Sequence, residues 1–125
     1  MARFSLILFV FIASLTLSLP AAAVWGWLRG AAITEFTDSD WVMLKAEARR
    51  VLDEVDDKTR VDWTNPETGN GGSMKPLTTF EVDGHTCRQM AFKQVTAKGI
   101  EGQAVYHLCQ QDDSTWQFVA ESELN

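Results

Sequence analysis

Positive charge is scarce in this 125-residue chain, which has 11 lysines and arginines against 17 aspartates and glutamates and a formal net charge of -6. A protein of this charge repels nucleic acid and anionic lipid surfaces, so neither is expected as a partner of the domain. Apolar residues make up 46% of the sequence, which excludes a disordered chain. Because the length suffices for one modest core, we expect a single folded domain.

Cysteine is also rare, since the chain contains only Cys87 and Cys109. A structural zinc site takes four closely spaced ligands, and catalytic disulfide pairs usually occur as Cys-x-x-Cys. The spacing here favours a structural disulfide over a metal or redox site. No cysteine lies near the N-terminal segment, so a lipid-modified N-terminus is not expected.

Charge is absent between Arg3 and Arg29, and this stretch has two interpretations. A basic start, an apolar run over residues 4–19 and then Ala21-Ala22-Ala23 are typical of a secretory signal peptide covering residues 1–23. An uncleaved helix over residues 4–28 is the alternative, because it is long enough to anchor the chain in a membrane. On both interpretations the chain is exported from the cytoplasm. We expect a connector over residues 24–37 and a domain over residues 38–125.

The domain is expected to begin with a helix. Thr37-Asp38-Ser39-Asp40 offers side-chain oxygens that cap free backbone N–H groups. The apolar residues that follow recur at helical spacing on one face: Trp41, Leu44, Ala48, Val51, Leu52 and Val55. This face is expected to cover a small sheet, and docking on a partner protein is the alternative.

The rest of the chain has the texture of a β-meander. Residues 63–72 are dense in turn-forming residues and predict a structured loop without metal-ligand or phosphate-loop spacing. Four strand-like runs follow at residues 77–82, 86–96, 100–110 and 115–120, separated by turn signals. The sequence therefore predicts an α+β domain in which one amphipathic helix packs on an antiparallel meander of about four strands.

The middle turn sets a strand register. Ala97-Lys98-Gly99 suits a three-residue hairpin loop that ends in a left-handed residue, which pairs Thr96 with Ile100. Carrying this register outward places Cys87 opposite Cys109, within reach of a disulfide. We therefore predict the bond Cys87–Cys109, which fits an oxidising compartment outside the cytoplasm.

Candidate catalytic groups are few. His85 and His107 fall about 13 Å apart in this register, too far to share a metal ion. The acids cluster at the end of the predicted helix and in a turn, where solvated side chains are the ordinary explanation. We expect no enzyme activity, no metal and no cofactor, and an envelope hydrolase that uses His85 or His107 is the weakest alternative.

One group of residues carries a family resemblance: Trp63, Asn65, Pro66, Thr68, Gly69, Asn70, Gly72, Pro76, Cys87, Arg88, Cys109 and Trp116. Over residues 38–120 the chain resembles the C-terminal domain of the rickettsial-type 17 kDa surface antigen family of bacterial envelope proteins. The resemblance implies an envelope protein of undefined biochemical activity. The lipidation cysteine and glycine-zipper segment that often precede this domain are absent, which favours a periplasmic form or one tethered to the inner membrane.

The leading functional hypothesis is a non-enzymatic cell-envelope module, structural or protein-binding, with an unidentified envelope partner. A membrane-tethered accessory subunit of a larger envelope complex is the alternative. Burial is the ordinary explanation for each aromatic residue of the domain. Any ligand or partner surface is expected at the turn-rich loop and three aromatic positions: Trp63, Asn65, Pro66, Thr68, Gly69, Asn70, Tyr106 and Trp116.

Overall fold

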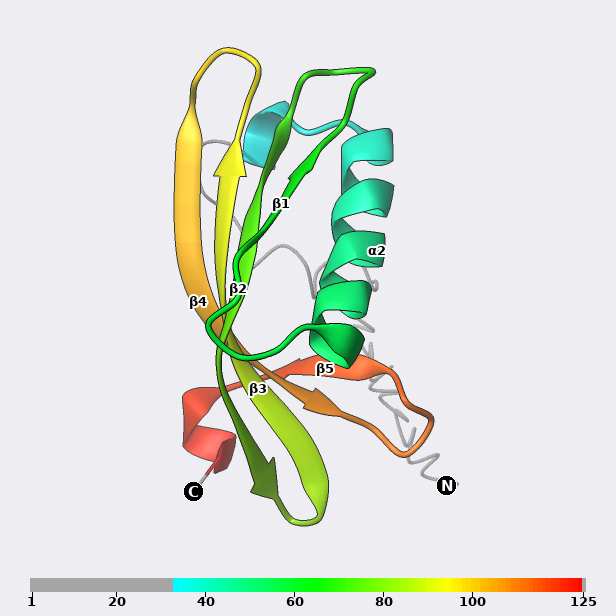
Figure 1. Cartoon of the computed structure of the whole chain (residues 1–125), viewed down its shortest axis with the longest axis vertical. Helices are drawn as coiled ribbons and strands as arrows, with labels where there is room; N and C mark the ends of the chain where they lie inside the picture. Colours follow the sequence, from blue (N-terminus) through cyan, green and yellow to red (C-terminus); the bar gives the residue numbers. More distant parts are fainter. Residues whose placement is uncertain (1–32, 125) are drawn as a thin grey trace, which may run out of the picture.

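The computed structural model describes residues 33–124, so the signal-peptide and membrane-anchor interpretations fall outside the described residues. A short 3-10 helix, η2 (Ile33–Glu35), precedes helix α2 (Asp38–Glu54), and a second 3-10 helix, η3 (Glu121–Leu124), follows the last strand. Between them lie β1 (Val61–Thr64), β2 (Gly71–Val82), β3 (His85–Val95), β4 (Glu101–Gln110) and β5 (Trp116–Val119). The expected α+β class is confirmed (Figure 1).

The sheet is a five-stranded antiparallel meander in the order β1-β2-β3-β4-β5, with one strand more than the sequence predicted. Strand β1 and the start of β2 include both ends of the loop that was expected at residues 63–72, and there the expectation was wrong. Gly71 and Gly72 resemble turn residues in the sequence, but a Cβ on either would overlap the backbone of a neighbouring strand. These glycines are therefore in the strand because only a residue without a side chain permits such close approach.

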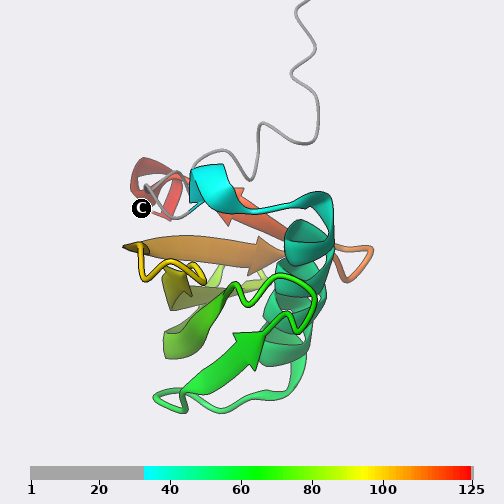
Figure 2. The same cartoon turned by 90° about the horizontal axis from the view of Figure 1, so that it is seen from above.

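Helix α2 starts at a cap formed by its own side chains. The Thr37 side chain accepts the Asp40 N–H, and the Asp40 carboxylate accepts the Thr37 N–H in return, which completes a capping box. The predicted buried face is confirmed for Leu44, Ala48, Val51 and Leu52, while Trp41 and Val55 are half-buried. Figure 2 shows this helix against one face of the sheet.

The core lies between α2 and that face. Side chains alternate between the two faces of a strand, so Met90 and Phe92 of β3 enter the core together with Trp63, Met74 and Leu108 from the other strands. The intervening residues, such as Ala91 and Lys93, lie on the opposite face. Among the described elements no helix packs on that second face (Figures 1 and 2).

The β3–β4 hairpin has the predicted register. Thr96 N–H donates to Ile100 O at 2.9 Å, Gly99 has a φ of 83°, and Cys87 pairs with Cys109. The predicted disulfide is present, with an S–S length of 2.02 Å. In the described part of the chain, no helix is long and apolar enough to cross a membrane.

Candidate functional site

The turn-rich loop between β1 and β2 encloses a buried carboxylate. Asp40 is completely buried, and its two oxygens accept five hydrogen bonds of 2.6–3.1 Å: from Thr37 N and Oγ1, Asn65 Nδ2, Thr68 Oγ1 and Asn70 Nδ2. No lysine or arginine among the described residues forms an ion pair with Asp40. Hydrogen bonds and the positive end of the helix dipole therefore stabilise this charge.

These contacts decide the ionisation of Asp40. Burial by itself raises the pKa of the carboxyl group, but the hydrogen bonds, first those from Thr68 and Asn70, outweigh burial and lower the pKa to about 2. Asp40 is thus ionised at any physiological pH. A general acid or base needs a pKa near the operating pH, so this carboxylate is suited to holding the loop rather than to proton transfer.

The loop is rigid because its own backbone is also paired. Asn65 N–H donates to Asn70 O at 2.7 Å, and Gly69 N–H donates to Asn65 O at 2.8 Å. Asn70 Oδ1 accepts the N–H of Ala97 at 2.9 Å, which ties the loop to the β3–β4 turn. The Asn-Pro-x-Thr-Gly-Asn sequence is therefore a clasp that joins the start of α2 to two turns of the sheet.

A second buried charge, Arg88 on β3, holds the other end of α2. Its Nη1 donates to Leu52 O at 2.9 Å and Val51 O at 3.1 Å, which satisfies carbonyls at the end of the helix. Its Nη2 lies 2.8 Å from Asp57 Oδ1, and its Nε donates to Thr79 Oγ1 at 3.0 Å. The hydrogen bond from Arg88 holds the pKa of Asp57 below its usual value.

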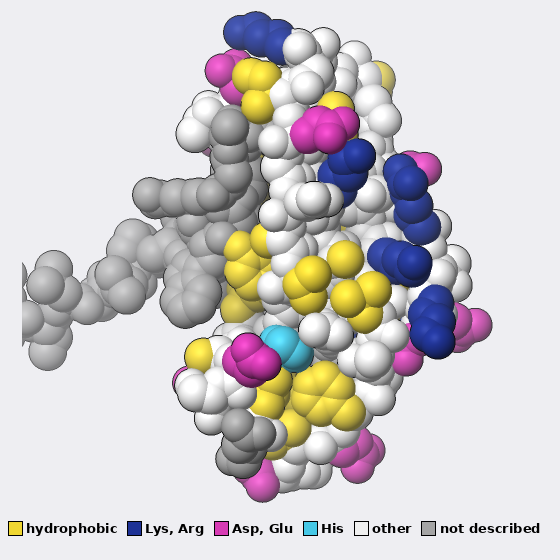
Figure 3. Space-filling model, turned by 90° about the vertical axis from the view of Figure 1, so that its left-hand side faces the viewer, with side chains coloured by type: hydrophobic (Ala, Val, Ile, Leu, Met, Phe, Trp, Pro, Cys, Tyr) yellow, Lys and Arg dark blue, Asp and Glu magenta, His cyan; other side chains and the backbone are white. Residues whose placement is uncertain are grey.

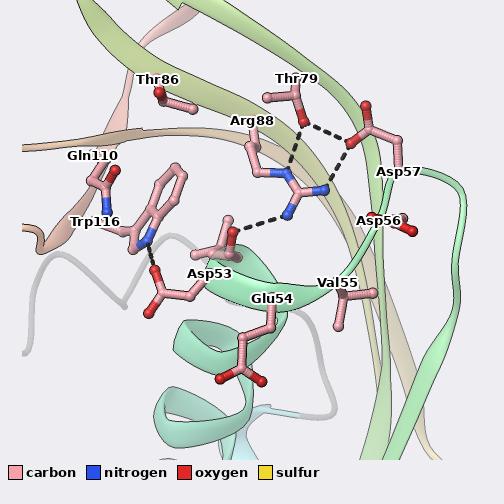
Figure 4. Close-up of a pocket in the computed structure, with 11 residues that line it drawn as sticks. Asp53, Glu54, Val55, Asp56, Asp57, Thr79, Thr86, Arg88, Gln110 and Trp116 are labelled. Carbon is pink, nitrogen blue, oxygen red and sulfur yellow. Dashed lines mark hydrogen bonds and ion pairs between the residues drawn. The ribbon is translucent and has the colours of Figure 1, made fainter.

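Beside Arg88 lies a groove of about 400 Å³, bordered by the acids at the end of α2 and by Trp116 of β5 (Figure 4). Trp116 Nε1 donates to Asp53 Oδ1 at 2.8 Å, so this indole joins β5 to the helix. Asp53 and Asp57, two of the four acids that line the groove, thus already bind groups of the protein. The groove therefore lies where the end of α2 is bonded to the sheet, through Asp53 and Trp116 and through Asp57 and Arg88.

The uncovered face of the sheet carries a different surface. A trough of about 470 Å³ runs across it, lined by Arg60, Ser73, Lys75, Ala91, Phe92, Lys93, Gln103, Ala104 and Val105. Lys75 pairs with Ala91, which pairs in turn with Val105, so one row across three strands runs from a cation to two apolar residues. Figure 3 looks onto this face and shows lysine and arginine side chains along one side, with hydrophobic side chains next to them.

The residues predicted to form a ligand surface are not brought together into one site. Trp63 is buried in the core, and Asn65 and Asn70 are buried against Asp40. Pro66 and Gly69 are exposed and Thr68 is half-buried near the start of α2, whereas Trp116 contacts Asp53, about 20 Å further along the helix. A ligand role for this set stays a prediction.

Tyr106, the remaining candidate, is half-buried beside Phe92 and Phe118, with ring centroids 6.1 and 5.4 Å apart. His85 Nδ1 lies 3.0 Å from Gln110 O, and the His107 ring contacts Phe80 edge-on. In residues 33–124 no group of three or more His, Cys, Asp or Glu side chains is placed to hold a metal ion.

Sequence reasoning missed three features of the site. Asp40 was identified as a helix cap but not as the centre of the clasp, and the buried role of Arg88 was not anticipated. The cations of the uncovered face were also missed. Alternation along the predicted strand at 86–96 was the available signal for Lys93, but Arg60 and Lys75 lay outside every predicted strand.

Comparison with known proteins identifies a family for this chain. Residues 50–117 match the family model described as "17 kDa outer membrane surface antigen". The chain is 31% identical over 84 residues to the 17 kDa surface antigen of Rickettsia prowazekii (strain Madrid E), and 32% identical over 83 residues to that of Rickettsia felis. Each match covers 66% of this chain and 52% of the relative, so the chain spans about half the length of these proteins.

No solved structure matches the chain. The family match covers the clasp loop, Arg88 and both cysteines, which are the residues that hold the helix and the hairpins of this domain together. On this match, the chain belongs to the 17 kDa outer membrane surface antigen family.

Proposed function

We propose that this chain is a non-enzymatic module of the bacterial cell envelope that binds another envelope component through the uncovered face of its sheet. The observation that carries the proposal is the one-sided covering of the sheet. Helix α2 packs on one face, while the other face presents a trough next to Val105, which is 50% exposed. Contiguous apolar surface next to polar side chains is typical of interaction sites, and the trough combines Ala91, Ala104 and Val105 with polar residues. Membership in a surface antigen family supports the envelope location.

The buried charges of the domain favour binding over catalysis. Asp40 and Arg88 are the charged residues with the least exposure, and the fold uses both of them: one closes the clasp and the other caps α2. Asp40 is enclosed by the clasp, and Arg88, which borders the groove at the end of α2, donates its N–H groups to the helix, Thr79 and Asp57.

Photo-crosslinking in intact envelopes tests the proposal. A photoreactive amino acid replaces Val105 on the uncovered face, and a matched one replaces Val42, which is 69% exposed on α2. We expect a discrete adduct from position 105 that position 42 does not give. Identical adduct patterns from the two positions, or turnover of ester, peptide or glycan substrates by the purified chain, would contradict the proposal.

A further inference from the structure

We infer that the trough on the uncovered sheet face docks on the phosphate headgroups of anionic lipids. The inference rests on the proposed function, because it names the chemistry of the component that this face binds. It also revises the expectation drawn from net charge alone, since the charge of this face differs in sign from that of the whole chain.

The first argument is the crowding of cations. Val61 pairs with Met74, so the preceding residue, Arg60, falls opposite Lys75. Lys93 pairs with Ser73, which places it diagonally from Lys75 on the adjacent strand. Like charges at neighbouring cross-strand positions destabilise a sheet. A cluster of this kind is therefore better explained by an anion that binds there than by the stability of the domain.

The acids on the same face offset this cluster only in part. Arg60 Nε lies 2.8 Å from Asp62 Oδ1, and Lys93 Nζ lies 3.5 Å from Glu101 Oε1. Both pairs are solvent-exposed, where ion pairs contribute little and exchange readily for another anion. Lys75, between them, forms no ion pair with any residue of the described chain.

The shape of the trough distinguishes a lipid from an acidic protein segment. Small residues, Ser73 and Ala91, lie between the longer cationic side chains, and the exposed Val105 follows in the same row. The cations are thus gathered at one end and the apolar residues lie beside them, an arrangement that fits a phosphate next to hydrocarbon. An extended acidic segment would be matched instead by cations spread along a strand.

The distribution of charge bears on which face of the domain approaches an anionic membrane. All 17 acids lie in residues 33–124, and two of them, Asp62 and Glu101, pair with cations of the trough. Charges further away than the Debye length, about 8 Å at physiological ionic strength, are largely screened. The cations of the uncovered face, rather than the net charge of the chain, therefore act on a membrane that this face approaches.

An environment-sensitive fluorophore tests the inference on the full chain. Because Cys87 and Cys109 form a disulfide, a Val105→Cys variant offers one thiol for labelling, and Val42→Cys is the matched control on α2. The label at position 105 should shift to the blue on vesicles that contain phosphatidylglycerol, and not on vesicles of phosphatidylcholine alone. This readout is local, so attachment of the chain through residues 4–28 does not mimic it.

Charge variants complete the test. A triple variant should raise the half-saturating lipid concentration by roughly 100-fold, because it removes three surface cations that each attract the anionic membrane: Arg60→Gln, Lys75→Gln and Lys93→Gln. Lys45→Gln with Arg49→Gln and Arg50→Gln changes the net charge equally on the helix and should have little effect. Thermal unfolding of both variants checks that they are folded.

Four outcomes overturn the inference. Equal shifts on neutral and anionic vesicles, or equal losses in both triple variants, exclude recognition of phosphate by this face. An envelope crosslink from position 105 to a protein, without a vesicle response, identifies an acidic protein partner and leaves the proposed function intact. If position 105 gives neither a crosslink nor a vesicle response, the proposed function is overturned as well.

Discussion

At the scale of single residues, Asp40 shows how a charge can be buried without a counter-ion. Removing a carboxylate from water is costly unless its lone pairs are satisfied, and here five donors satisfy them. Four of these donors are side chains, namely a threonine hydroxyl at the helix cap and the Asn, Thr and Asn of the clasp. The motif that looks like a ligand loop in the sequence binds a carboxylate of its own chain.

The variant Asp40→Asn should lower the free energy of unfolding at pH 7 by about 3 kcal/mol. The new amide NH₂ group would face the N–H and O–H donors that now bind the carboxylate, and these donors would lose their acceptor. Urea unfolding followed by tryptophan fluorescence measures the change. Asp38→Asn, two residues away and exposed, is the matched control and should cost much less. A neutral Asp40→Asn variant would show that the clasp does not contribute to stability.

The same carboxylate makes stability depend on pH. Its pKa is lowered in the folded state from 3.8 to about 2, so its contribution is complete above pH 4–5 and is lost as the pH falls toward 2. The loss amounts to about 2 kcal/mol. Wild type and Asp40→Asn should therefore converge in stability on acidification. Parallel curves between pH 5 and pH 2 would contradict this assignment.

At the scale of elements, β2 is the strand on which the sheet depends. It pairs with β1 over four residues and with β3 over its whole length, and a bulge between Pro76 and Thr78 resets its register. Where it lies between β1 and β3, it presents Gly71 and Gly72 to their backbones. The tight approach lets Trp63 of β1 reach the core under α2.

Gly72→Ala should destabilise the domain by about 2 kcal/mol or more, because the new Cβ would overlap Lys93 O and backbone cannot move as a side chain does. Gly84→Ala is the informative control. A Cβ there meets no atom within 4 Å, and its φ of 80° alone costs about 1 kcal/mol. If the two variants unfold at the same urea concentration, the close backbone approach at Gly72 does not make an alanine there more destabilising than at Gly84.

At the scale of the whole molecule, the domain is a two-layer structure with one small core. Such a core leaves little margin of stability, and the disulfide, Arg88 and the clasp supply connections at three separated places. The disulfide closes a loop with a sequence separation of 22 residues between β3 and β4. In the chain-entropy account, a loop of this size contributes about 3 kcal/mol.

The double variant Cys87→Ala with Cys109→Ala should therefore lose about 3 kcal/mol of stability while keeping the same far-ultraviolet circular dichroism. Chemical denaturation of the oxidised wild type and the variant measures the difference. Mass spectrometry of wild-type chain alkylated at the moment of cell lysis gives an independent check. Two alkylated cysteines in that sample would contradict the bond and the oxidising compartment it implies.

Local sequence determined the elements whose causes are local. The residues from Thr37 to Asp40 predict the start of α2, the spacing of Leu44, Ala48 and Val51 predicts its buried face, and the turn before Ile100 predicts the pairing of Cys87 with Cys109. In each case the determining atoms lie within one helix or one hairpin. The family resemblance was likewise carried by residues close in sequence.

Tertiary structure alone decided the rest. Whether Gly71 and Gly72 belong to a turn or a strand depends on how closely β1 and β3 approach them. The clasp residues that bind Asp40, and the Val51, Leu52 and Asp57 oxygens that bind Arg88, lie 25 or more residues away along the chain. The side of the sheet that α2 covers likewise determines that Arg60, Lys75 and Lys93 share an open face. Contacts between distant segments set these features, and no local pattern of residues records them.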